Sequence, residues 1–177
     1  MKNLRSFGFN ALWVAPCLLF AAGPACGRGA SPQPPRDEVS VEKFVHAFYD
    51  WYVPIASNDE SDSSVKMALR EKGFMLDPSL LASLQISVRK QGAKPGFVSG
   101  LDFDPFLGTQ DPFSHYKLEF PFKKNGNYFV NIKSIRNGKL HEPPDVVAEV
   151  KKQHGSWVFS DFHYSNGHDL INILKGQ

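Results

Sequence analysis

Cysteine is almost absent from this 177-residue chain: its two cysteines are Cys17 and Cys26, and none follows. A disulfide-stabilised fold is therefore excluded for everything after residue 26. A strong charge of either sign is also lacking, because 20 Lys and Arg residues face 18 Asp and Glu residues. This balance does not call for a polyanionic partner, and we expect no contact with nucleic acid.

The usual motifs of enzymes and metal sites are missing as well. The patterns HExxH, GxSxG, GxGxxG and CxxC do not occur, and the six histidines are scattered. His163 and His168 come closest to a metal pair, but their spacing has no strong geometric basis. Asp102 and Asp104 could begin a calcium loop, yet Phe106 stands where the next oxygen ligand belongs. We therefore assign no catalytic residue and expect no metal and no cofactor.

The first 26 residues have the pattern of an export signal. Lys2 and Arg5 form a basic start, and residues 11–22 form an apolar run too short to span a bilayer as a mature helix. Small residues then precede Cys26, as in a bacterial lipobox, in which this cysteine is lipidated. The match is imperfect, so a plain cleaved signal or an uncleaved anchor stays open.

Lipidation at Cys26 would anchor the protein in the outer membrane, facing the periplasm; otherwise we expect a periplasmic or secreted protein. Residues 27–39 are rich in Gly, Pro and Ser and predict a disordered tether. Residues 40–177 are expected to form one domain, since this length suits one well-buried core and is short for two.

Helical periodicity predicts three helices in the first half of that domain. The first has Ser40 as its N-cap, places aromatic residues on one face and stops at Pro54. A short second helix ends at Gly73. The third has Asp77 as its N-cap and Pro78 in its first turn, followed by leucines on one face.

The second half changes to the alternation that is typical of strands. Three dipeptides there favour hairpin turns: Asn125–Gly126, Asn137–Gly138 and His154–Gly155. Helices followed by such strands predict an α+β fold, in which three N-terminal helices pack on an antiparallel sheet of about four strands. A short helix is expected at the C-terminus.

No periodicity is present between residues 92 and 115, where the stretch GLDFDPFLGTQDP lies. Asp104 and Asp111 each precede a proline, a setting in which the Asp side chain caps its own turn. Phe106 and its apolar neighbours would anchor such a loop. We interpret Asp104, Phe106 and Asp111 as structural residues and the loop as an ordered plug.

Four polar residues are candidates for binding. The turns of the plug would leave Asp102 and Gln110 free. Asp161 and His163 alternate with the aromatic residues of the last predicted strand, so a regular register would put them on the same face as those rings. A carboxylate beside an apolar wall has a raised pKa, which an isomerase-like mechanism requires.

The order of the segments FYDWYVP, LDPSLLASL, DFDPFLGTQDP and GSWVFSDFHY resembles a family of exported bacterial proteins of unknown function, often lipoproteins, within the nuclear-transport-factor-two-like superfamily. The resemblance covers most of residues 40–175. It implies a cone, related to the cystatin-like fold, in which a strongly curved sheet wraps around the helices and leaves a pocket at its wide end. The family brings no established activity, and the superfamily includes isomerases, dehydratases and binding domains.

Three functions follow from these expectations. The first is a non-enzymatic lipoprotein of the cell envelope, or a secreted binding or adaptor domain, that holds an envelope protein or a small ligand. The second is an immunity or inhibitor protein that neutralises one toxic enzyme. The third is an isomerase-like or dehydratase-like enzyme that uses the cone pocket.

Overall fold

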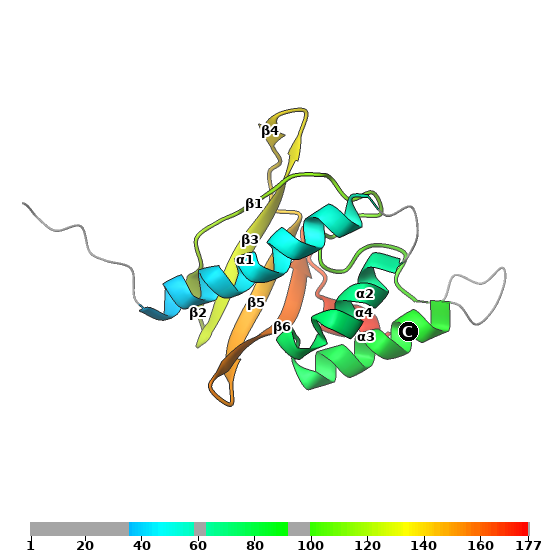
Figure 1. Cartoon of the computed structure of the whole chain (residues 1–177), viewed down its shortest axis with the longest axis horizontal. Coiled ribbons are helices and arrows are strands. Elements are labelled where there is room, and N and C mark those ends of the chain that lie inside the picture. Colours follow the sequence, from blue (N-terminus) through cyan, green and yellow to red (C-terminus); the bar gives the residue numbers. More distant parts are fainter. Residues whose placement is uncertain (1–35, 59–62, 92–99, 177) are drawn as a thin grey trace, which may run out of the picture. The chain divides into compact units, whose positions relative to one another are not determined.

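The computed structural model describes residues 36–58, 63–91 and 100–176, so the predicted leader, Cys26 and residues 27–35 lie outside the described residues. Helices α1 (Arg36–Ala56), α2 (Ser63–Glu71) and α3 (Pro78–Gln91) come first, with the 3-10 helix η1 (Gly73–Met75) between the last two (Figure 1). Six strands and the short helix α4 (Leu170–Lys175) follow, which confirms the predicted α+β class. None of the described helices is long and apolar enough to cross a membrane.

Helix α1 is longer at both ends than the sequence predicts. It begins at Arg36, so residues 36–39 of the predicted tether are helical and Ser40 lies inside the helix instead of capping it. Pro54 lies in the last turn rather than ending the helix. Its missing N–H removes one hydrogen bond there, which costs less than in a helix centre because the helix ends at Ala56.

Helix α3 begins as its sequence predicts. The backbone N–H of Ser79 donates to Asp77 Oδ1 at 2.9 Å, so Asp77 is the N-cap. Lys151 of the sheet pairs with Asp77 Oδ2 at 2.6 Å. Burial raises the pKa of Asp77, but the hydrogen bonds from Lys151 and Ser79 outweigh it and lower the pKa to about 2. The start of α3 is thereby fixed to the sheet.

The sheet is antiparallel and is built around one long strand. Its strands are β1 (Tyr116–Leu118), β2 (Phe122–Lys124), β3 (Asn127–Arg136), β4 (Lys139–Leu140), β5 (Val146–Gln153) and β6 (Ser156–Tyr164). The order is β1-β3-β5-β6, and β2 and β4 also pair with β3. Six strands instead of about four are present because β1, β2 and β4, each two or three residues long, pair with successive parts of β3.

The three predicted hairpin turns are confirmed. Asn125–Gly126 joins β2 to β3 with φ of 51° and 89°, the left-handed values that a tight two-residue hairpin needs. The dipeptides at 137–138 and 154–155 have positive φ at both residues in the same way and join β3 to β4 and β5 to β6. These turns set the register of the hairpins.

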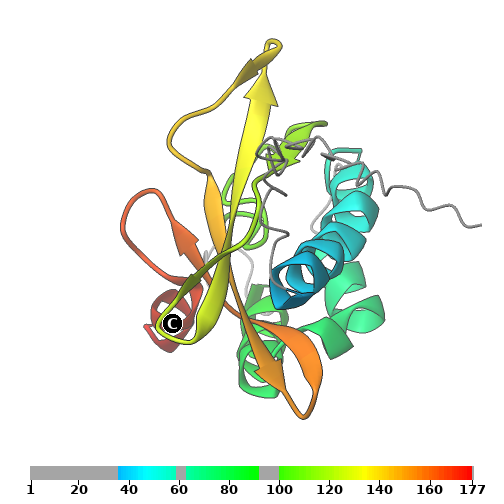
Figure 2. The same ribbon diagram turned by 90° about the vertical axis from the view of Figure 1, so that its left-hand side faces the viewer.

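The sheet is not strongly curled, so the strongly curved sheet expected from the resemblance is wrong. Three of the six strands are too short to bend around a core, and the described pairings contain one register shift, between β5 and β6. Helix α1 lies across one face of the sheet (Figures 1 and 2). We call the opposite face the outer face.

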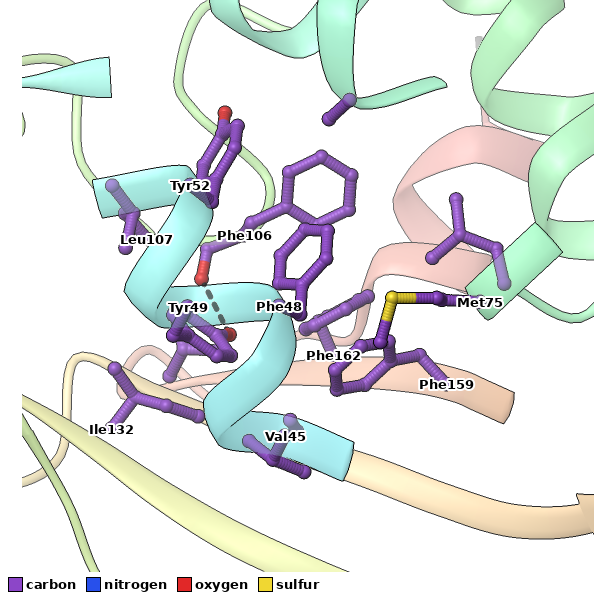
Figure 3. Packing of buried hydrophobic residues seen from close by; sticks show 14 of the residues in the cluster. Val45, Phe48, Tyr49, Tyr52, Met75, Phe106, Leu107, Ile132, Phe159 and Phe162 are labelled. Atoms are coloured by element: carbon purple, nitrogen blue, oxygen red, sulfur yellow. Dashed lines mark hydrogen bonds between the residues drawn. The ribbon is translucent and has the colours of Figure 1, made fainter. Parts of the chain in front are cut away.

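The core between α1 and the sheet is filled by aromatic rings (Figure 3). Six of them are almost fully buried: Phe48, Tyr49, Tyr52, Phe106, Phe159 and Phe162. The ring of Phe48 lies 5.3 Å from Tyr52 and 5.2 Å from Phe106, measured between centroids, with favourable stacked and edge-on geometry. Side chains therefore occupy the inner space in which the expected cone would have its pocket.

Candidate functional site

Asp104 lies at the centre of the loop between α3 and β1. Its Oδ1 accepts hydrogen bonds from the backbone N–H groups of Phe106, at 2.8 Å, and Leu107, at 3.0 Å, which confirms the predicted turn cap. Its Oδ2 accepts from the Tyr52 hydroxyl of α1 at 2.5 Å. Burial raises the pKa of Asp104 to about 6, although these hydrogen bonds oppose the rise.

Apolar residues also anchor the described part of this loop, residues 100–115. Phe106 is fully buried and accepts a hydrogen bond at its carbonyl from the Tyr49 hydroxyl, at 2.9 Å (Figure 3). The ring of Phe103 lies 5.1 Å from that of Tyr164. The described part of the loop thus packs between α1 and β6 as an ordered plug.

The second predicted cap in the loop is not made by Asp111. The Thr109 hydroxyl closes this turn, since it accepts from the Asp111 backbone N–H and donates to the Asp111 carbonyl, both at 3.2 Å. The carboxylate of Asp111 is exposed, as are Asp102 and Gln110. None of the hydrogen bonds or ion pairs between described residues involves the side chains of Asp102 or Gln110, which leaves both available to solvent.

A β-bulge in β6 changes the orientation of the other two candidates. Val150 pairs with Phe159, but the next pair is Glu149 with Asp161, so Ser160 is the extra residue. The expectation that Asp161 lies on the same face as Phe159 is therefore wrong. Asp161 and His163 point to the outer face.

Several side chains share this outer face, and β3 and β5 supply most of them: Phe129, Asn131, Lys133, Val147 and Glu149, together with Asp161 and His163. Glu149 lies at the centre of a hydrogen-bonded group. Its Oε2 is 2.9 Å from His163 Nε2, and its Oε1 accepts from the Asn127 amide at 2.6 Å. Ser160, the bulged residue, donates to the same Oε1 at 3.1 Å. Glu149 is thus held in one orientation facing His163.

Asp161 and Asp169 complete a cluster at the end of β6. Asp161 is buried, and its Oδ1 accepts from the backbone N–H groups of Phe162 at 2.8 Å and Ile171 at 3.1 Å. Asp169 is the N-cap of α4, where its Oδ1 accepts from the backbone of Asn172 at 2.9 Å. Burial raises the pKa of Asp161, the two amide bonds and His163 lower it, and the nearby Asp169 raises it further.

A separate hollow lies where α1, η1 and the β5–β6 hairpin meet. This surface groove has a volume of about 580 Å³ and is lined by Ser40, Phe44, Phe74, Met75, Lys152, Gly155, Ser156 and Trp157. Phe74 is 75% exposed, the most exposed of the large apolar side chains in the described ranges. The indole N–H of Trp157 donates to the Ser40 hydroxyl at 2.8 Å, which ties the two walls of the groove together.

Comparison with known proteins adds no further assignment. No protein-family model, no curated protein and no solved structure matches this chain. The site is therefore defined by its own geometry.

Sequence reasoning named Asp161 and His163 but missed Glu149, Asp169 and Phe74. Asp169 could have been found, because it precedes the predicted C-terminal helix and Asp is a preferred N-cap. Glu149 lies between two buried residues of an alternating strand. This position indicates that its side chain points away from the core, but it does not indicate which residue it contacts. The exposure of Phe74 has no signal in the sequence pattern.

Proposed function

We propose that this chain is a non-enzymatic binding domain of the bacterial cell envelope, exported, held at the membrane by a lipid on Cys26, and binding a partner protein in the groove beside Phe74. The observation that carries the proposal is the groove itself. Phe74 stands 75% exposed next to Phe44, Met75 and Trp157 rather than as a single surface ring. Contiguous apolar surface of this kind is typical of protein interaction sites.

The charge at the groove indicates what kind of partner fits. Lys152 lines it, with its ammonium 4.9 Å from the centre of the Trp157 ring. Lys152 also pairs with Asp37 of α1, but at 3.4 Å and with both side chains about half exposed. A pair this exposed contributes little, so it exchanges readily for another carboxylate. The groove therefore suits a protein segment that carries a large apolar side chain next to an acidic one.

The filled interior favours binding over an isomerase-like reaction. Such a reaction needs a substrate space beside a carboxylate, and the buried carboxylate nearest the core rings, Asp104, is bound by Tyr52 and two backbone amides. Phe106 and its aromatic neighbours occupy the space around it. Membership of the nuclear-transport-factor-two-like superfamily is part of this proposal and rests on the order of the sequence segments alone.

Site-specific photocrosslinking tests the groove directly. A benzophenone amino acid placed at position 74 in the full chain, in living cells, is expected to give one or a few discrete crosslinked envelope proteins. The control places the same group at Ile86 of α3, which is 54% exposed but does not line the groove. Crosslinks from position 74 should disappear when Lys152→Glu reverses the charge at the groove.

Equal crosslinking patterns from positions 74 and 86, or a pattern from 74 that Lys152→Glu leaves unchanged, would refute the groove as the binding site. Loss of membrane attachment in a Cys26→Ser variant is expected separately, and normal attachment of that variant would remove the lipid anchor. A single partner with very tight affinity would identify the immunity-type function instead.

A further inference from the structure

Three side chains of the types that bind metal ions lie close together at the end of β6 and the start of α4. One ring nitrogen of His163 and one carboxylate oxygen each of Asp161 and Asp169 lie within 4.8 Å of one another. A β-bridge between His163 and Asp169 fixes the turn that brings the third residue back to the strand. We propose that these three side chains bind one divalent transition-metal ion of the Zn²⁺ type.

The charge around Asp161 is the first support. Two other buried aspartates have cationic partners: Asp77 pairs with Lys151 at 2.6 Å, and Asp145 pairs with Arg136 at 2.5 Å. Buried Asp161 has neither a Lys nor an Arg partner among the described residues; His163 and a second carboxylate, Asp169, lie beside it. None of the Lys or Arg ion pairs between described residues involves either of the two. A bound divalent cation would offset two carboxylates that have no Lys or Arg partner.

The orientation of His163 is the second support. Its Nε2 lies 2.9 Å from Glu149 Oε2, and Glu149 is itself held by Asn127 and Ser160. A carboxylate at this position accepts a hydrogen bond from Nε2–H, which leaves the lone pair on Nδ1 free for a metal. Carboxylate groups behind a ligating histidine have this role in known metal sites, where they fix the tautomer and raise the basicity of the ligand.

The ligand set also indicates the type of ion. An imidazole with two carboxylates suits Zn²⁺ or a related transition metal better than Ca²⁺ or Mg²⁺, which prefer oxygen ligands alone. Three protein ligands leave one tetrahedral position for water. Ligand atoms around Zn²⁺ lie about 3.4 Å apart, given bonds of about 2.1 Å, so binding draws the three groups closer together by small side-chain rotations. The carboxylate oxygens of Asp169 accept from Asn172 and keep a second lone pair for the ion.

Metal titration of the full chain after removal of metals with EDTA tests the site. Calorimetry with Zn²⁺ alone and visible absorption with Co²⁺ alone are each expected to show one ion per chain. His163→Ala is expected to weaken Zn²⁺ affinity about 100-fold or more. Glu149→Gln, which keeps the shape but not the charge behind the histidine, is expected to weaken it about 10–100-fold. Asp169→Asn retains an oxygen for the helix cap and is expected to weaken affinity at least about tenfold.

The matched control is His168→Ala, which removes an exposed histidine of the same turn and is expected to leave the affinity within about twofold. Phe74→Ala is also expected to leave it unchanged, so this site and the groove are tested separately. Absence of saturable binding up to about 1 mM Zn²⁺, where even a weak site binds, would overturn the proposal. Equal losses in His163→Ala and His168→Ala, or no loss in His163→Ala, would overturn it as well. Circular dichroism of each variant confirms that a lost affinity is not a lost fold.

Discussion

The two faces of the sheet are stabilised in different ways. The inner face packs aromatic rings of β6 against α1 and the plug, and the buried carboxylate of Asp104 beside these rings is enclosed by hydrogen bonds. The outer face carries ion pairs and side-chain hydrogen bonds, such as Lys133 between Glu119 and Glu142 at 2.7 and 2.6 Å. Stability is thus expected to depend mainly on the packing of the inner face.

The two buried aspartates of the described residues that have no Lys or Arg partner show the same contrast. Asp104 has a tyrosine hydroxyl and two amides as donors, and its pKa is raised to about 6. Asp161 has two amides but also a histidine and a second carboxylate within reach of one ion. The hydrogen-bonding capacity of Asp104 is satisfied within the fold, whereas Asp161 is suited to bind a ligand.

The largest expected effect comes from removing a ring on the inner face. Phe106→Ala is expected to lower the free energy of unfolding by about 3–5 kcal/mol, because it leaves a cavity among fully buried rings. Phe122→Ala, a half-exposed ring stacked on Phe129 of the outer face, is expected to cost about 1 kcal/mol or less. Urea unfolding of both variants measures the difference, and equal losses would contradict the contrast between the faces.

A glycine pair tests how tightly the plug meets the sheet. Gly108 has φ of +67°, and a Cβ there would lie 2.8 Å from the Asp145 carbonyl oxygen and 2.8 Å from Val146 Cγ2. Gly108→Ala is expected to cost about 2–4 kcal/mol, from left-handed strain plus steric overlap. Gly126→Ala in the β2–β3 turn meets no atom within 4 Å and should cost only the strain, about 1–2 kcal/mol. A similar loss of stability for both substitutions would mean that the plug shifts to make room for the added methyl group.

The pH dependence of stability reports on Asp104. Its pKa is raised on folding from 3.8 to about 6, so between these values the native state binds more protons than the unfolded state. Stability from this group is therefore highest below about pH 4 and falls by about 2–3 kcal/mol as the pH rises to about 6. Asp104→Asn should remove this fall, and Asp102→Asn in the same loop should keep it. The measurement is the free energy of unfolding of the wild type and of each variant at pH 4, 5, 6 and 7. The difference between the wild type and a variant is then compared across these pH values.

The smallest effect is expected at the groove. Phe74→Ala and Ile86→Ala remove side chains that are 75% and 54% exposed, so each should change the free energy of unfolding by about 0.5 kcal/mol or less. A much larger loss for Phe74→Ala would mean that this ring supports the fold rather than a partner. Thermal unfolding of the two variants side by side makes the comparison.

Local signals were enough to predict much of the fold. The Asp77 cap and the three positive-φ dipeptides act through their own side chains and backbone, so the residues alone specify them. Asp104 was predicted as a turn cap for the same reason. The start of α1 at Arg36 was missed, because residues 36–39 contain a single apolar residue, Val39, and directly follow a segment rich in Gly, Pro and Ser.

Features that depend on a partner strand could not be predicted. The bulge at Ser160 is set by pairing with β5, and it reverses the face on which Asp161 lies. The contact between His163 and Glu149 depends on that reversal, so Glu149 could not be found, whereas Asp169 has a local N-cap signal. The strong curvature was taken from the resemblance and not from the residues, and the structure contradicts it.

The partner protein is expected to bind at the groove and not within the aromatic interior. A ¹H–¹⁵N spectrum recorded during titration with anilinonaphthalene sulfonate, an aromatic anion that fits both Phe74 and Lys152, tests it most directly. Saturable shifts are expected at η1 and residues 152–157, weakened in Phe74→Ala and retained in Ile86→Ala. Shifts centred on Phe106 and Phe162 instead, with η1 unaffected, would contradict it.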